Sequence, residues 1–109
     1  MTKEEILAQS VYAGAIESFE SKSFDFDNAV RELRNNKDKQ REQELVQASK
    51  SAWALYCYQM SYLLYLADNI KDTDGTAAAE AAKDLRKMVF EDLQGKYEYI
   101  MFVTNPQNP

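Results

Sequence analysis

The sequence predicts an all-α fold, a single domain of three to four antiparallel helices packed as a bundle around a long central helix at about residues 38–71. The chain has 109 residues but only three glycines and two prolines, and both prolines lie among its last four residues. So few helix-breaking residues favour long helices over many short strands. The length fits one domain, and a 45% hydrophobic content is enough for one core. We therefore expect a helical domain over residues 1–103 and a flexible polar tail over 104–109.

The first helix is expected to run from Thr2 to about Ser21. Thr2 and Glu5 have the spacing of a capping box, which marks a helix start. Apolar residues then follow at helical spacing: Ile6, Leu7, Val11, Ala15 and Phe19. Residues 23–28 are rich in Ser, Asp and Asn and are expected to form a connector, with Asp25 as the N-cap of a short second helix. Its apolar stripe contains Phe26, Ala29, Val30 and Leu33.

The third helix is the longest and the most apolar. Residues 34–44 are all polar, so they form either an exposed loop or a solvated overhang of a helix. We favour a break near Asn36, with the third helix starting around Asp38. Its expected face comprises Leu45, Ala48, Ala52, Leu55, Tyr56, Gln59, Tyr62, Leu63, Leu66 and Ile70. Because the stretch from Ala52 to Ala67 is apolar almost all round, this helix should be central in the bundle or shared between two subunits.

The last part of the chain predicts a fourth helix starting near Ala77. Its core stripe is Ala78, Ala82, Leu85, Val89 and Leu93. Gly95 is a possible C-cap, but the apolar phase continues beyond it. Residues 96–103 therefore remain open between a continued helix and a strand.

Composition excludes several kinds of chemistry. The chain has no histidine, the commonest general base and metal ligand, and its single cysteine, Cys57, cannot form an internal disulfide or a cysteine zinc site. We expect no cofactor, no metal and no catalytic residue. A lone cysteine fits a reducing, cytoplasmic setting. The net charge of −5 disfavours direct nucleic-acid binding, and no run is long and apolar enough for a membrane span.

Asp72-Thr73-Asp74-Gly75-Thr76 resembles the opening loop of the haloacid-dehalogenase-type phosphohydrolases, in which the first aspartate is the nucleophile and the second the general acid. That loop follows a buried strand, whereas the residues before Asp72 continue a helical phase. The same stretch resembles part of an EF-hand loop, but Ile70 and Ala81 stand where the first and last acidic ligands belong. The alternative is an interhelical turn in which Asp74 or Thr76 caps the fourth helix and Gly75 adopts a conformation that other residues resist.

Tyr62-Leu63-Leu64-Tyr65-Leu66-Ala67-Asp68 resembles a helix of the all-α nucleoside-triphosphate pyrophosphatases of the MazG type. This resemblance implies a four-helix core, magnesium and two acidic motifs. Glu17 and Glu20 have the spacing of the first motif, but the second is missing before the apolar run. A small magnesium-dependent enzyme using Glu17, Glu20, Asp72 and Asp74 is thus one functional alternative.

The leading functional hypothesis is a non-catalytic protein-binding module, such as an inhibitor, an immunity-type protein or an adaptor. Four tyrosines crowd into residues 56–65, and tyrosine is at home at interfaces because it combines apolar area with a hydroxyl. The same helix could form a homodimer. The expected partner or dimer interface is Trp53, Tyr56, Tyr58, Met60, Leu64 and Tyr65. A third alternative is an acidic inhibitor that mimics nucleic acid.

Overall fold

The computed structural model describes residues 1–70 and 75–104, and this part of the chain forms five helices and no strand. The helices are α1 (Lys3–Leu7), α2 (Ser10–Asn35), α3 (Lys39–Asp68), α4 (Thr76–Gly95) and α5 (Tyr97–Thr104). The expected all-α bundle is confirmed.

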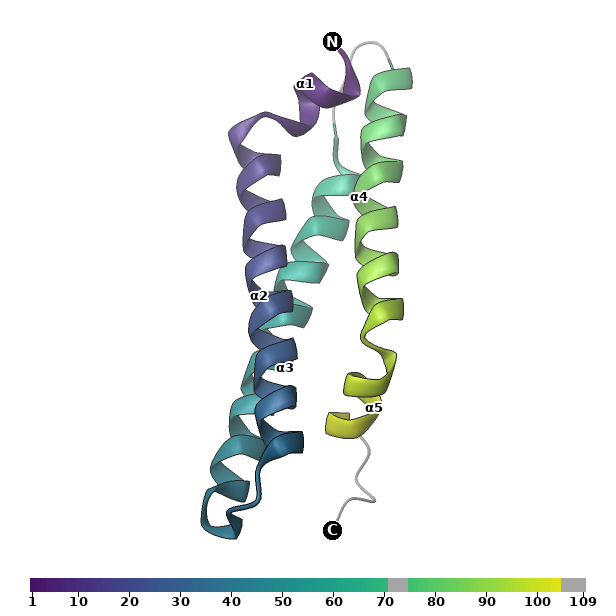
Figure 1. Ribbon diagram of the computed structural model, residues 1–109. Coiled ribbons are helices and arrows are strands. Elements are labelled where there is room, and N and C mark those ends of the chain that lie inside the picture. The colour runs from purple at the N-terminus through teal and green to yellow at the C-terminus, as the bar shows by residue number, and fades with distance from the viewer. Residues whose placement is uncertain (71–74, 105–109) are drawn as a thin grey trace.

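Three long helices build the body of the molecule. α2 and α3 form an antiparallel hairpin, and α4 lies antiparallel to α3 and packs against it (Figure 1). Short α1 crosses one end of the bundle against α4, and α5 turns back at the opposite end. The result is an elongated rod of 57 × 23 × 17 Å. In a rod this narrow, much of every helix faces solvent.

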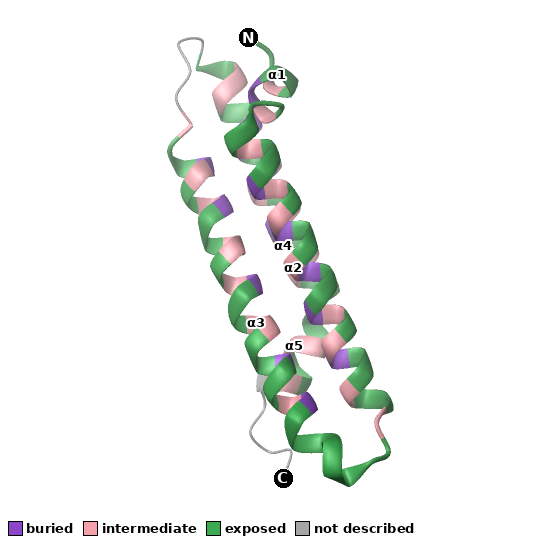
Figure 2. Ribbon diagram, turned by 90° about the vertical axis from the view of Figure 1, so that its left-hand side faces the viewer, coloured by how far each residue is buried: buried purple, intermediate pink, exposed green. Residues whose placement is uncertain are grey.

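The buried residues that form the core lie along the inner sides of α2, α3 and α4 (Figure 2). Its fully buried large apolar residues are Phe19, Phe26 and Val30 of α2, Tyr56 and Leu63 of α3, and Leu85 and Val89 of α4. The ring of Tyr56 contacts those of Phe19 and Phe26, with ring centroids 5.3 and 6.1 Å apart. Burial of these rings is the main term that holds the three helices together.

The first half of the chain corrects two sequence predictions. The capping box at Thr2 is present, but the first helix ends at Leu7 and a new one begins at Ser10. This break lets Ile6 become buried and places Lys3 3.1 Å from Asp84 of α4.

Residues 23–28 form no connector, and Asp25 is not an N-cap, because α2 continues through them to Asn35. Phe19, Ser23, Phe26 and Val30 lie on one buried face. Tertiary burial of that face outweighs the turn preference of the Ser and Asp residues.

The predicted break near Asn36 is confirmed, and Asp38 caps α3 by accepting a hydrogen bond from the backbone N–H of Gln40 at 2.9 Å. The predicted face of this helix is rotated. The buried residues are Leu45, Ser49, Tyr56, Leu63 and Ala67, whereas Ala48, Leu55 and Tyr62 are exposed. Both sets repeat at helical spacing, so periodicity alone could not separate them.

The end of the chain settles the choice left open for residues 96–103, because α5 is a helix. The N-cap of α4 is Gly75, whose φ of 70° is the left-handed conformation expected of it. Thr76 is the first helical residue and not the cap, and no side chain among the described residues caps α4. Asp72 and Asp74 lie outside the described residues, with the rest of residues 71–74. The tail was predicted over 104–109, but Thr104 is the last residue of α5, and residues 105–109 lie outside the described residues.

Candidate functional site

The face of α3 that points away from the core carries a line of exposed residues. They alternate at spacings of four and three, which keeps them on one side of a helix. We call this line the outer stripe: Gln47, Ser51, Ala54, Tyr58, Ser61, Tyr65 and Asp68, all of them exposed. Tyr58 and Tyr65 keep 69% and 61% of their surface in contact with solvent. Leu55 and Tyr62 flank the stripe and are also exposed.

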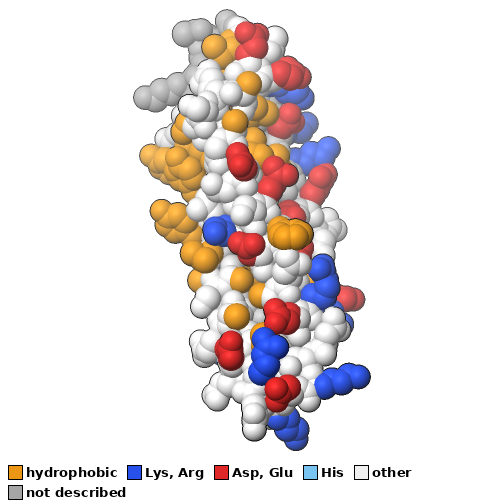
Figure 3. All heavy atoms as spheres, turned by 60° about the vertical axis from the view of Figure 1, so that its left-hand side comes forward, with side chains coloured by type: hydrophobic (Ala, Val, Ile, Leu, Met, Phe, Trp, Pro, Cys, Tyr) orange, Lys and Arg blue, Asp and Glu red, His pale blue; other side chains and the backbone are white. Residues whose placement is uncertain are grey.

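The exposed side of this helix lacks the charges that normally solvate a helix surface. Residues 51–67 contain no Asp, Glu, Lys or Arg, although seven of these seventeen residues are exposed. Charged residues are depleted and tyrosine is enriched at the centre of protein interfaces. Figure 3 shows hydrophobic side chains gathered along one edge of the molecule and charged side chains along the other edge and the lower end.

Small residues of α2 extend this surface. Val11, Gly14 and Ser18 line a shallow groove with Tyr58 and Tyr62 of α3. A Cβ atom added at Gly14 would meet no atom within 4 Å, so the space above this glycine is open. The surface therefore combines exposed tyrosine rings with a groove partly lined by small residues. A helix of a partner can pack against a surface of this shape.

The six residues predicted as an interface fall into three groups. Tyr58 and Tyr65 lie on the outer stripe. Trp53, Met60 and Leu64 are half-buried against the hydrophobic core. Tyr56 is 0% exposed and offers no surface to a partner of the folded chain. Leu55 and Tyr62 belong to the predicted core-facing side of α3, but both are exposed. The buried side is the one on which Leu63 lies, and Leu55 and Tyr62 are rotated away from it around the helix.

A partly buried polar cluster lies where α2, α3 and the end of α4 meet, and sequence reasoning missed it. Its centre is Asp92, which accepts hydrogen bonds from the hydroxyl of Tyr56 at 2.7 Å and from the hydroxyl of Ser23 at 3.0 Å. Lys96 is 4% exposed, and its Nζ lies 2.8 Å from Asp27 Oδ1 and 3.6 Å from Asp92 Oδ2. We call these five residues, Ser23, Asp27, Tyr56, Asp92 and Lys96, the polar cluster.

The polar cluster is internally satisfied. Lys96 also donates to the carbonyl of Ser23 at 3.3 Å and lies 5.4 Å from the centre of the Tyr56 ring. Burial, with the carboxylate of Asp92 as hydrogen-bond partner and nearby charge, raises the pKa of Tyr56 well above its ordinary value. Tyr56 is therefore a hydrogen-bond donor at neutral pH and not a base. The break between α4 and α5 falls at Lys96, which joins the two helices to α2.

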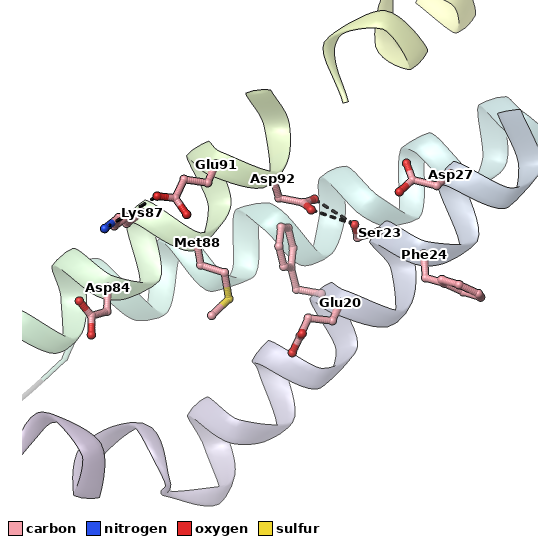
Figure 4. A pocket seen from close by; sticks show the side chains of 10 residues that line it. Glu20, Ser23, Phe24, Asp27, Asp84, Lys87, Met88, Glu91 and Asp92 are labelled. Carbon is pink, nitrogen blue, oxygen red and sulfur yellow. Dashed lines mark hydrogen bonds and ion pairs between the residues drawn. The ribbon is translucent and has the colours of Figure 1, made fainter. Parts of the chain in front are cut away.

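A groove between α2 and α4 collects acidic side chains, including Glu20, Asp84 and Glu91 (Figure 4). Most of these groups already have cationic neighbours, since Asp84 pairs with Lys3 and Glu91 with Lys87. Among the described residues no group of three or more Asp, Glu, His or Cys side chains is placed to hold a metal ion. Glu17 and Glu20, named for the magnesium alternative, are both exposed on α2.

The comparisons with known proteins add no family to this description. No protein-family model, no curated protein and no solved structure matches the chain. Within residues 1–70 and 75–104, no helix is both long and apolar enough to cross a membrane.

Proposed function

We propose that this chain is a non-catalytic protein-binding module whose binding surface is the outer stripe of α3 with the flanking groove of α2. The observation that carries the proposal is the charge-free run of residues 51–67 on a helix that exposes Tyr58 and Tyr65. A solvated helix face normally carries charged residues, whereas this one has the composition of a contact surface. An inhibitor or adaptor role in the cytoplasm is consistent with this proposal.

The difference between the polar cluster and the outer stripe supports a binding role over a catalytic one. Tyr56, whose pKa is strongly raised, is 0% exposed, and its hydroxyl already donates to Asp92 within the polar cluster. A catalytic site keeps such groups open to a substrate. The outer stripe, in contrast, presents tyrosine rings, small residues and hydroxyls, which provide contact area and hydrogen bonds at a low entropic cost.

Affinity capture from a native lysate tests this proposal. Three baits are compared: the wild-type chain, the double variant Tyr58→Lys/Tyr65→Lys, and the control Phe24→Lys. Phe24 is 65% exposed on the α4 side of α2, so this control adds a charge at an equally exposed aromatic position on another face. The wild type and the control should retain the same proteins, including untagged copies of the chain itself, and the double variant should lose them. Equal retention by all three baits would contradict the proposal.

A further inference from the structure

The outer stripe is complementary to itself when two copies of α3 run in opposite directions. We infer that the partner of this surface is a second copy of the chain, paired antiparallel through α3 about a two-fold axis between residues 59 and 60. This inference rests on the proposed function and names the partner that the same surface takes.

Side-chain size is the first reason. In the proposed register the numbers of two facing residues add up to 119, so Tyr58 faces Ser61 of the second copy and Tyr65 faces Ala54 of the second copy. Each large exposed ring thus meets a small residue, and the two-fold axis repeats both pairs. Such alternation of large and small residues lets two helices interdigitate at the close spacing of packed helices.

Charge is the second reason. In the same register Asp68 faces Ser51 of the second copy, whose neighbour in the chain is Lys50, an exposed cation. Asp68 already pairs with Arg86 at 2.6 Å but keeps 66% of its side chain exposed, so its carboxylate can accept a second cation. The charge-free segment would then end at an ion pair on each side, as apolar interface centres end at a polar rim.

A parallel pairing lacks both kinds of complementarity. Equivalent positions would then face each other. Tyr58 would meet Tyr58, Ser61 would meet Ser61, and the carboxylate of Asp68 would meet its own copy. Large residues would collide while small ones left gaps, and like charges would repel each other. The pattern therefore selects the antiparallel direction.

The available area is compatible with a dimer. Four tyrosine rings, two from each copy, could alone contribute on the order of 500 Å² of buried surface at their observed exposure. This is about half of the roughly 1,000 Å² that marks a specific interface. Leu55, Tyr62 and the small residues of the stripe lie beside these rings and enlarge the contact.

Site-directed cross-linking in the full chain tests the register. In a Cys57→Ser background, single cysteines are placed at Ser61 or at Gln47, both exposed on the outer stripe. A helix rises about 1.5 Å per residue, so the proposed register offsets the two copies of position 61 by about 4 Å along the axis and those of position 47 by about 37 Å. With a short thiol-specific bifunctional reagent, Ser61→Cys should give a covalent dimer and Gln47→Cys should not.

The control adds Tyr58→Lys/Tyr65→Lys to the Ser61→Cys chain and should lower its cross-linking to the level of the denatured protein. Equal cross-linking of both cysteine variants would overturn the antiparallel register. Absence of cross-linking in both would overturn self-pairing altogether. In that case, loss of captured proteins from lysate by the double lysine variant would leave the proposed function standing with a different partner, and unchanged capture would remove both proposals.

Discussion

Tyr56 and Tyr58 are two residues apart on α3, yet they occupy opposite environments. Tyr56 is 0% exposed, donates a hydrogen bond to Asp92 and packs between Phe19 and Phe26. Tyr58 is 69% exposed on the outer stripe. Two residues correspond to about 200° of rotation around a helix, which carries the second ring from the core to solvent. The inner face of α3 thus uses a tyrosine to stabilise the fold, whereas the outer face exposes tyrosines that are available to contact a partner.

The strongest test of this difference replaces each tyrosine by alanine. Tyr56→Ala should lower the free energy of unfolding by about 4 kcal/mol, because it leaves a cavity and removes the donor to Asp92. Tyr58→Ala should change it by about 0.5 kcal/mol or less. Urea unfolding, at a concentration where the chain sediments as a monomer, measures both. Similar losses at the two positions would show that the outer face also contributes to the monomer fold.

The polar cluster provides the second comparison, between two adjacent acids on α4. Asp92→Ala should lower the free energy of unfolding by about 3 kcal/mol, because the hydroxyls of Ser23 and Tyr56 lose their acceptor and Lys96 loses one of its two carboxylates. Its matched control is Glu91→Ala. Glu91 forms only an exposed pair with Lys87 at 3.8 Å, so a change of about 0.5 kcal/mol or less is expected. Equal effects would mean that the cluster does not stabilise the fold.

Alkaline pH should distinguish Tyr56 from the exposed tyrosines. Its pKa is raised by burial and by Asp92, so below the ordinary value of 10.0 both folded and unfolded chains hold the proton. Above that pH the unfolded chain loses the proton while the folded chain keeps it. Stability should therefore fall as pH rises, by up to about 1.4 kcal/mol per pH unit from this group.

Chemical denaturation at a series of pH values above neutrality measures this slope. Tyr56→Phe is the control, because it keeps the ring and removes the ionisable hydroxyl. The variant should be less stable near neutral pH but should show a shallower alkaline decline than the wild type. An equal decline in both chains would show that Tyr56 does not cause it.

The smallest expected change in the free energy of unfolding is that of a substitution at Ser49, on the inner face of α3. The hydroxyl of Ser49 is buried and has no hydrogen-bond partner within the residues that the structure describes. Because an unsatisfied buried hydroxyl is unfavourable and alanine favours helix, Ser49→Ala should raise the free energy of unfolding by about 1 kcal/mol. Ser51→Ala on the outer stripe, where the hydroxyl is solvated, should gain only the smaller helix-propensity part. Thermal melting of the two variants compares them.

The sequence predicted several helix starts and breaks more accurately than it predicted which face of a helix is buried. The Thr2 capping box, the break near Asn36 and the start of the third helix around Asp38 are local signals, and each appears where it was predicted. The face of α3 was misjudged because Leu55 and Leu63 are both apolar and both periodic, and only packing against α2 and α4 decides which of them is buried. The connector at residues 23–28 failed for the same reason, since Ser23 is held in α2 by its contact with Asp92.

The polar cluster could not be predicted because its members are far apart in the sequence. Ser23 and Asp92 meet across 69 positions, and Tyr56 reaches Asp92 across 36. Each residue, taken by itself, looks like an ordinary surface serine, acid or lysine. The interface prediction named Tyr58 and Tyr65, which lie on the outer stripe, because clustered tyrosines are a local signal.

Sedimentation equilibrium over a range of concentrations tests the central claim that the outer stripe is a contact surface for a second copy. The wild type and the Phe24→Lys control should show a reversible monomer–dimer equilibrium. Tyr58→Lys/Tyr65→Lys should remain monomeric with a nearly unchanged melting temperature at low protein concentration. A wild-type chain that stays monomeric at the highest concentration, or a double variant that dimerises as well as the wild type, would contradict the account.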